Sequence, residues 1–239
     1  MKDTSRPNPS ERLRHLHEIL ERAYGPQHWW PGDSPFEVVL GAYLTQNTSW
    51  SAAARSLANL RAAGALTPSG LRHLPLDELK TLIRPSGFFT RKAPALKAFL
   101  AMLDQEYSGS LEALAAVPTP ELRRRLLSLP GVGQETADAI LLYALNHPVP
   151  VVDEYLRRIA VRHGLANPAP GPKGYEQLTH LVRSAFASAN ANAHLRLYNE
   201  AHALIVAVGK THCTKVAQCE GCPLKPDLYP QITPTPHQN

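Results

Sequence analysis

The sequence predicts an all-α fold, and three observations support that prediction. Apolar residues recur at helical spacing, as along residues 13–20, and no segment of the 239-residue chain alternates apolar and polar residues as a half-buried strand would. Several segments begin with a capping residue followed by proline, such as Thr67-Pro68 and Thr119-Pro120, which is the pattern of a helix start. These starts explain much of the high proline count of 22, so the prolines indicate short helices and not disorder.

The expected helices follow one another closely along the chain. Ser10 is expected to cap the first helix, and Ser34, followed by Pro35 and Glu37, forms a capping box for the second. Gly209 is expected to end the last long helix. Further helices are expected at about 49–63, 76–83, 90–104, 120–128, 136–146, 154–163, 174–188 and 192–208.

The composition is that of a soluble globular protein. An apolar content of 44% and a charged content of 19% are ordinary, and the net charge of +5 favours an anionic partner only weakly. No apolar stretch approaches the roughly 20 residues that a membrane helix needs, and the N-terminus lacks the core of a signal peptide. We therefore expect a cytoplasmic protein that binds no membrane.

The most informative motif is a turn formed by Gly131, Val132 and Gly133, between two helical segments within about residues 121–146. Two glycines around an apolar residue permit positive φ, and they expose successive N–H groups at the start of the next helix, where a phosphate can bind. This is a helix-hairpin-helix arrangement, which grips the phosphate backbone of DNA without reading its sequence.

With the flanking Leu-Pro and Thr-Ala pairs and the downstream Val151-Val152-Asp153, the chain resembles the helix-hairpin-helix DNA glycosylase superfamily, in particular the endonuclease III branch. The resemblance covers about residues 30–225. It implies a six-helix barrel domain of residues 37–147 and a second helical domain made of residues 1–36 and 148–239, flanking a DNA-binding cleft. It further implies base excision repair on double-stranded DNA with a damaged base, by a monomer associated with the nucleoid.

Two carboxylates bear on the reaction. In the family, the aspartate at the position of Asp153 is essential, and the lysine of the lyase members falls at the position of Glu135. A carboxylate cannot form the Schiff base that β-elimination requires, so Glu135 favours a monofunctional glycosylase that uses water. Asp153 would orient or deprotonate that water and offset the charge that develops on the sugar. Simpler roles stay open: a helix cap for Asp153, and a solvated first-turn residue for Glu135.

All three tryptophans of the chain lie in two neighbouring segments, which suggests a pocket for a flipped base. These segments resemble the 3-methyladenine DNA glycosylase offshoot of the branch. That resemblance implies that Trp29, Trp30, Pro31 and Trp50 stack around an electron-poor alkylated purine, which suits electron-rich indoles. It also implies that Gln46 fills the gap left in the duplex. Core packing is the alternative role for the tryptophans.

The three cysteines are too few for a disulfide framework, and their close spacing favours a metal site. They are Cys213, Cys219 and Cys222. Endonuclease III relatives hold a [4Fe–4S] cluster there, in a loop that corresponds to residues 213–229, through four cysteines. This chain lacks the fourth, and we expect Asp227 to replace it, with His212, Tyr229 or a water as alternatives. Zinc held by His212 and the three cysteines is the second possibility, and unligated thiols are the third.

Basic residues offer contacts to phosphates on both sides of the expected cleft. Lys215 lies in the cluster loop, and Arg91 with Lys92 lies on the barrel side. Solvated side chains are the alternative for each of them.

Three functions remain open at this point. The first is a monofunctional DNA glycosylase for alkylated purines. The second is an endonuclease III-like glycosylase and AP lyase for oxidised pyrimidines, which Glu135 disfavours. The third is a non-catalytic protein that binds damaged DNA, which Asp153 disfavours.

Overall fold

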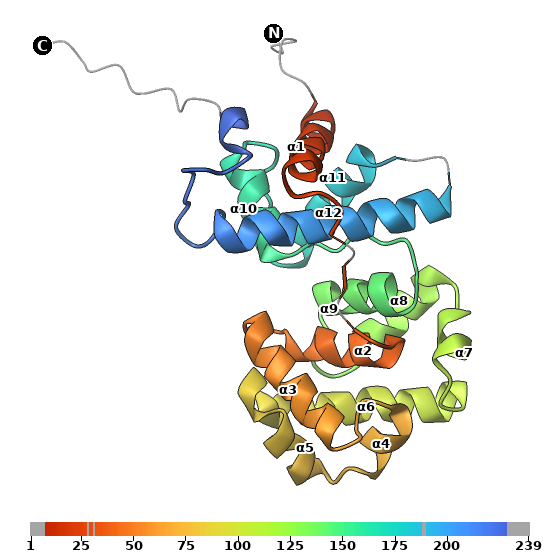
Figure 1. Cartoon of the computed structure of the whole chain (residues 1–239). Helices are drawn as coiled ribbons and strands as arrows, with labels where there is room; N and C mark the ends of the chain where they lie inside the picture. The colour runs from red at the N-terminus through yellow and green to blue at the C-terminus, as the bar shows by residue number, and fades with distance from the viewer. Residues whose placement is uncertain (1–7, 28, 31, 188–189, 229–239) are drawn as a thin grey trace, which may run out of the picture. The chain divides into compact units, whose positions relative to one another are not determined.

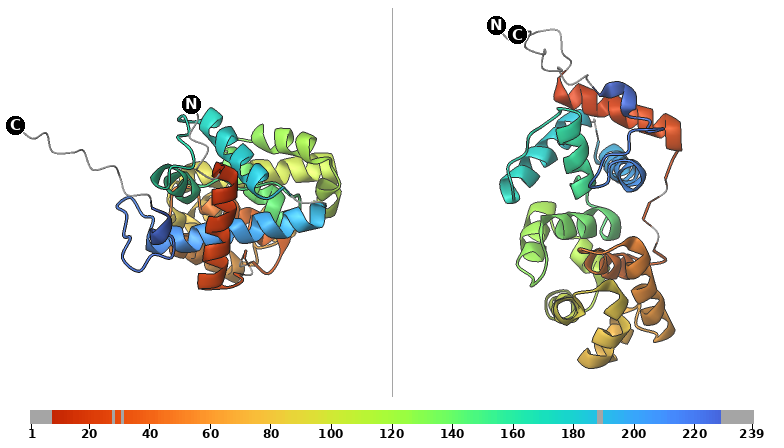
Figure 2. Two further views of the ribbon diagram at one scale, coloured as in Figure 1. Left: turned by 90° about the horizontal axis from the view of Figure 1, so that it is seen from above. Right: turned by 90° about the vertical axis from the view of Figure 1, so that its left-hand side faces the viewer.

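The structure is a computed structural model of the chain, and it describes residues 8–27, 29–30, 32–187 and 190–228. Helices and loops make up this part of the chain, and none of its segments is a strand, which confirms the all-α prediction (Figures 1 and 2). No helix in these ranges is long and apolar enough to cross a membrane. The α-helices are α1 (Pro9–Tyr24), α2 (Pro35–Leu44), α3 (Trp50–Ala62), α4 (Pro68–His73), α5 (Leu76–Leu82), α6 (Phe89–Tyr107), α7 (Leu111–Ala115), α8 (Thr119–Leu127), α9 (Gln134–Ala139), α10 (Glu154–Arg162), α11 (Pro172–Ala185) and α12 (Ala191–Thr211).

The chain divides into two compact units. The first, here called the terminal unit, comprises Met1–His28, Val152–Ala189 and Glu200–Asn239. The second, the hairpin unit, comprises Trp29–Val151 and Asn190–Asn199. The chain thus passes from one unit to the other next to Trp29 and again next to Asp153, and residues 190–199, expected in the second domain, belong to the hairpin unit.

Local capping signals predicted the starts of α2 and α4 correctly, and two other predicted caps need correction. Ser34 caps α2, since its Oγ accepts the N–H of Glu37 at 3.2 Å. The cap of α1, by contrast, is Asn8, two residues before the expected cap Ser10. Asn8 accepts the N–H of Ser10, and Glu11 accepts the N–H of Asn8, so a capping box precedes Pro9 at the first helical position. Thr119 is the first residue of α8 and not its cap.

The prediction that Gly209 ends the last helix is wrong, because α12 continues to Thr211. The reason is a close approach between helices. A Cβ at Gly209 would lie 2.3 Å from Cγ of Tyr155, so only glycine lets α12 lie against that ring of α10. Glycine at this position therefore serves packing and not termination.

The core of the hairpin unit is built around α2. Residues 36–44 of this helix are all buried, and α3, α6 and α9 pack against it. A helix that is buried all round needs apolar residues all round, and the exception in α2 is Glu37 of its first turn, whose carboxylate pairs with Arg61. Both functional segments of the hairpin unit that contain tryptophan, residues 29–30 and 45–50, adjoin the ends of α2, so they start from a rigid support.

Lys92 is part of this core, which corrects its expected role as a phosphate contact. Its side chain is buried, and Nζ donates to the carbonyl oxygens of Leu44 and Ser86, each at 2.8 Å. Burial lowers the pKa of Lys92 to about 8. The lysine therefore ties the end of α2 to the turn that precedes α6.

A pH-dependent stability follows for Lys92. In the unfolded chain its pKa is about 10.5, so between pH 8 and 10.5 the unfolded state binds a proton that the folded state lacks. This group therefore makes the free energy of unfolding rise with pH across that window. We expect the difference in free energy of unfolding between the wild type and Lys92→Met to be larger at pH 10 than at pH 7. Equal differences at the two pH values would contradict the assignment.

Candidate functional site

The hairpin consists of α8, an exposed turn and α9. Gly131 takes φ +76°, and a Cβ there would also lie 3.3 Å from Cβ of Ala95. Gly133 is the N-cap of α9 and provides no side-chain cap for the first turn of that helix. Arg123 of α8 and Asp138 of α9 form a two-point ion pair, with distances of 2.6 and 2.9 Å. The turn that sequence singled out is thus presented by two helices that a charge pair holds together.

Gln46 reaches this turn from the loop after α2. Its Nε2 donates to the carbonyl oxygen of Gly131 at 2.9 Å and to Oγ1 of Thr136 at 2.8 Å. Thr136 lies in the first turn of α9 and is buried. Gln46 and the hairpin turn, both predicted to bind DNA, are therefore in direct contact. Thr136, which also takes part in the contact, was noted in the sequence only as part of the hairpin motif.

Glu135 lies in the first turn of α9 and is exposed. A carboxylate at this place interacts favourably with the positive end of the helix dipole. The residue predicted to stand in place of the lyase lysine is thus an exposed acid beside the hairpin turn.

The three tryptophans form one aromatic cluster in the hairpin unit. Trp30 is its centre, with ring centroids 5.8 Å from Trp29 and 5.8 Å from Trp50, and Trp29 lies 6.1 Å from Trp50. Gly41 lies behind Trp30, where a Cβ would be 3.3 Å from Nε1. All three indoles are half-buried. Pro31, predicted as a pocket residue, lies outside the described residues.

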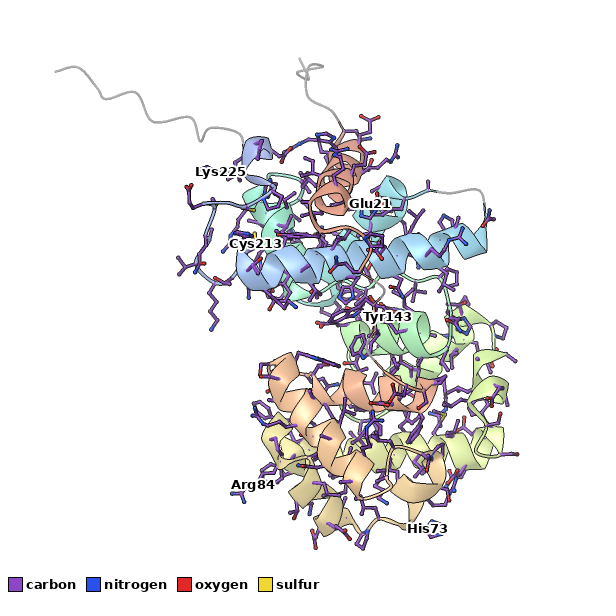
Figure 3. All side chains as sticks on the ribbon, viewed as in Figure 1. Glu21, His73, Arg84, Tyr143, Cys213 and Lys225 are labelled. Carbon is purple, nitrogen blue, oxygen red and sulfur yellow. The ribbon has the colours of Figure 1, made fainter. Side chains whose placement is uncertain are left out.

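A fourth ring, which sequence analysis missed, belongs to this cluster. This ring is Tyr143, which is labelled in Figure 3. Its centroid lies 5.1 Å from that of Trp30. Tyr143 belongs to a π-helical turn, Ile140–Ala144, that follows α9 directly. Such single turns often occur at functional sites. The π turn interrupts the continuous helix that was expected over residues 136–146. A search for apolar residues at a period of 3.6 does not detect such a turn.

Asp153 caps α10, and its carboxylate is held in one orientation. Oδ1 accepts the N–H of Leu156 at 2.7 Å, which confirms the capping role. Oδ2 lies 3.7 Å from Nε2 of His202 on α12, and both side chains are 8% exposed. Sequence had given no reason to single out His202, which is one of eleven histidines. The carboxylate therefore lies in a largely desolvated place beside an imidazole.

The three cysteines lie in the segment after α12, here called the cysteine loop (213–228). Figure 3 labels Cys213 at the start of this loop. Burial raises the pKa of the Cys222 thiol, and the neighbouring Cys213 and Cys219 raise it further. Arg158 and Arg162, four residues apart on α10, donate to carbonyl oxygens of residues 213–215. These two arginines thus fix the first residues of the loop to α10.

Asp227 does not fit the fourth-ligand role expected for it. Its Oδ2 accepts from Nη2 of Arg12 at 2.7 Å and lies 2.8 Å from Nδ1 of His163. The carboxylate instead joins the cysteine loop to α1 and to the end of α10. Nδ1 of His212, the alternative zinc ligand, lies 2.9 Å from the carbonyl oxygen of Gln218. Across the described ranges, no three of the His, Cys, Asp and Glu side chains form a group that could hold a metal ion.

Comparisons with known proteins agree with this description. The model of the HhH-GPD superfamily of base excision DNA repair proteins matches residues 40–184. A candidate DNA repair glycosylase of Methanocaldococcus jannaschii is 40% identical over 220 residues, covering 91% of this chain and 96% of the relative. Endonuclease III of Escherichia coli is 27% identical over 216 residues, covering 90% and 93%.

A solved structure extends the similarity to three dimensions. The crystal structure of the H. pylori 3-methyladenine DNA glycosylase bound to 1,N6-ethenoadenine has a TM-score of 0.71 and 29% identity. The alignment covers 89% of this chain and 100% of that one. The chain belongs to the HhH-GPD superfamily of base excision DNA repair proteins and is a DNA glycosylase.

Proposed function

We propose that this glycosylase removes alkylated purines from duplex DNA and leaves the strand uncut. The observation that carries the proposal is the aromatic cluster of Trp29, Trp30, Trp50 and Tyr143. An electron-poor, cationic base gains both stacking and cation–π attraction from indole and phenol rings. The similarity to a 3-methyladenine glycosylase that was solved with 1,N6-ethenoadenine supports the same class of substrate.

The chemistry follows from the two carboxylates. The N-glycosidic bond of a cationic base is already weak, so the enzyme has little need of a general acid. Asp153 orients or deprotonates the attacking water and offsets the positive charge that develops on the sugar. The N–H of Leu156 fixes Oδ1 for this task. Glu135 cannot form an imine, so the product is an abasic site in an intact strand.

One experiment tests the substrate and the product together. Duplexes that contain an alkylated purine, an oxidised pyrimidine or an abasic site are incubated with the protein, with and without later alkali. The proposal expects breaks in the alkylated duplex only after alkali. Breaks without alkali in the oxidised-pyrimidine or abasic duplex would instead show an endonuclease III-like lyase. Tight binding without any break would show a damage-binding protein.

Trp50 gives a test of the aromatic cluster. Stacking of a base on one aromatic ring contributes about 1–3 kcal/mol by alanine substitution, so we expect Trp50→Ala to lower kcat/KM for the alkylated duplex by about 5- to 150-fold. Trp50→Phe keeps a ring and should retain most of that activity. Thermal melting checks that both variants fold. Equal activity of the alanine and phenylalanine variants would show that Trp50 serves packing alone.

We propose further that the cysteine loop holds a [4Fe–4S] cluster through its three thiols, with a group other than Asp227 in the fourth position. Freshly purified protein should then contain iron and sulfide and absorb broadly in the visible range. Cys222→Ser should lose the iron, and Asp227→Asn should keep it. A colourless protein that contains zinc would support the ligand set with His212, and a metal-free protein would contradict both.

A further inference from the structure

We propose that Gln46 holds the phosphate-binding turn of the hairpin in shape, and that Thr136 is the positioning residue through which it does so. The proposal rests on DNA binding by the hairpin, which belongs to the proposed function. It assigns Gln46 a task on every duplex, with or without a lesion. The family resemblance, by contrast, gives Gln46 a task only where a flipped nucleotide leaves a gap.

The contact uses the whole donor capacity of the glutamine. A side-chain amide nitrogen carries two hydrogens, and Nε2 of Gln46 has two acceptors, the carbonyl oxygen of Gly131 and Oγ1 of Thr136. The partners lie 85 and 90 residues away in the sequence, so this is a tertiary contact and not a local turn. Insertion of the same amide into DNA would break both bonds.

The glutamine extends from a fixed support. Gln46 follows the buried helix α2 by two residues, and Oγ1 of Thr45 donates to the carbonyl oxygen of Gly41 at 2.9 Å. Lys92 binds the carbonyl oxygen of Leu44, the last residue of α2. Holding a glutamine in one rotamer costs side-chain entropy, which two tertiary hydrogen bonds offset.

The turn needs outside support. Its residues Gly131 and Gly133 have no side chains to pack, and the bond from the N–H of Val132 to the carbonyl oxygen of Leu129 is long, at 3.3 Å. Gly131 is exposed and has positive φ, a conformation that glycine leaves easily. A bond to the carbonyl of Gly131 fixes the orientation of that peptide, and the bond to Thr136 fixes the turn relative to α9. The N–H groups of the turn can point at one phosphate only when this peptide orientation and the position of the turn relative to α9 are both fixed.

The test measures binding to an undamaged duplex at several salt concentrations. Gln46→Leu removes the donor, and Thr136→Val removes the acceptor with little change of shape. We expect each to weaken binding by about 3- to 10-fold and to lower the slope of log K against log salt by about one phosphate contact. The double variant should bind the duplex no more weakly than the single variant that binds it more weakly. Both changes break the same hydrogen-bonded unit, so their effects do not add. Gln105→Leu, an exposed glutamine of α6, is the matched control and should bind like the wild type.

Two results would overturn the proposal. One is a Thr136→Val protein that binds the undamaged duplex like the wild type while Gln46→Leu weakens only binding to an abasic duplex. The other is a double variant whose loss equals the product of the single losses. Melting curves confirm that the variants fold. If Thr136→Val is unstable, the Gln46→Leu variant alone serves as the test, because Gln46 is only half-buried. Since no excision is measured, an inactive protein or a different damaged base would leave this test intact.

Discussion

Asp153→Asn is expected to lower the single-turnover rate of base release by at least about 100-fold while DNA affinity stays within a few fold of the wild type. Asparagine is nearly isosteric with aspartate, and its side-chain oxygen can still accept the N–H of Leu156. The cap of α10 is therefore kept. What the variant loses is the negative charge, which the reaction needs to activate water and to offset charge on the sugar.

A matched control distinguishes the negative charge of Asp153 from that of another carboxylate in the same turn. Glu154 follows Asp153 directly, and its half-exposed carboxylate pairs with Arg157 and Arg158. Glu154→Gln removes one negative charge from the same turn, and we expect its excision rate to stay within about threefold of the wild type. Rates measured at saturating enzyme, with affinity measured separately, keep binding apart from chemistry. An Asp153→Asn protein that excises as fast as Glu154→Gln would end the catalytic assignment.

Sequence predicted the fold where the signal is local. Helical spacing and capping residues act within a few positions, so the all-α class and the starts of α2 and α4 could be identified from the chain alone. The error at Gly209 has a different cause. A glycine that ends a helix and a glycine that admits a neighbouring ring look the same in sequence, and only the position of Tyr155 distinguishes them.

In the candidate site, too, local signals could be predicted from the sequence and contacts between distant residues could not. The hairpin glycines and the three tryptophans stood out because each is unusual in its own segment. Thr136, Tyr143 and His202 did not, because each acquires its meaning from a partner far along the chain. Asp227 illustrates the converse. Its spacing from the cysteines suggested a ligand, whereas its neighbours in space are Arg12 and His163, more than 60 residues away.

The second large effect is expected at the ion pair inside the hairpin. Arg123→Leu should lower the free energy of unfolding by about 2–4 kcal/mol and weaken binding to undamaged duplex DNA. Asp138 is only 2% exposed, and Arg123 contacts both of its oxygens from the opposite helix. Without the guanidinium, a carboxylate in a desolvated place loses two charge-assisted bonds, and the contact between α8 and α9 is weakened. Denaturant unfolding and DNA titration measure the two effects.

Two further variants decide whether desolvation is the cause. Arg125 of the same helix pairs with Glu106, whose carboxylate is 39% exposed, so Arg125→Leu should cost less than about 1 kcal/mol. The double variant Arg123→Leu with Asp138→Leu removes the buried charge together with its partner and should regain much of the lost stability. DNA binding should recover with it, since the hairpin needs its two helices packed and not the pair itself. If Arg123→Leu and Arg125→Leu cost the same, or if the double variant is less stable than Arg123→Leu, the hairpin does not depend on this buried pair.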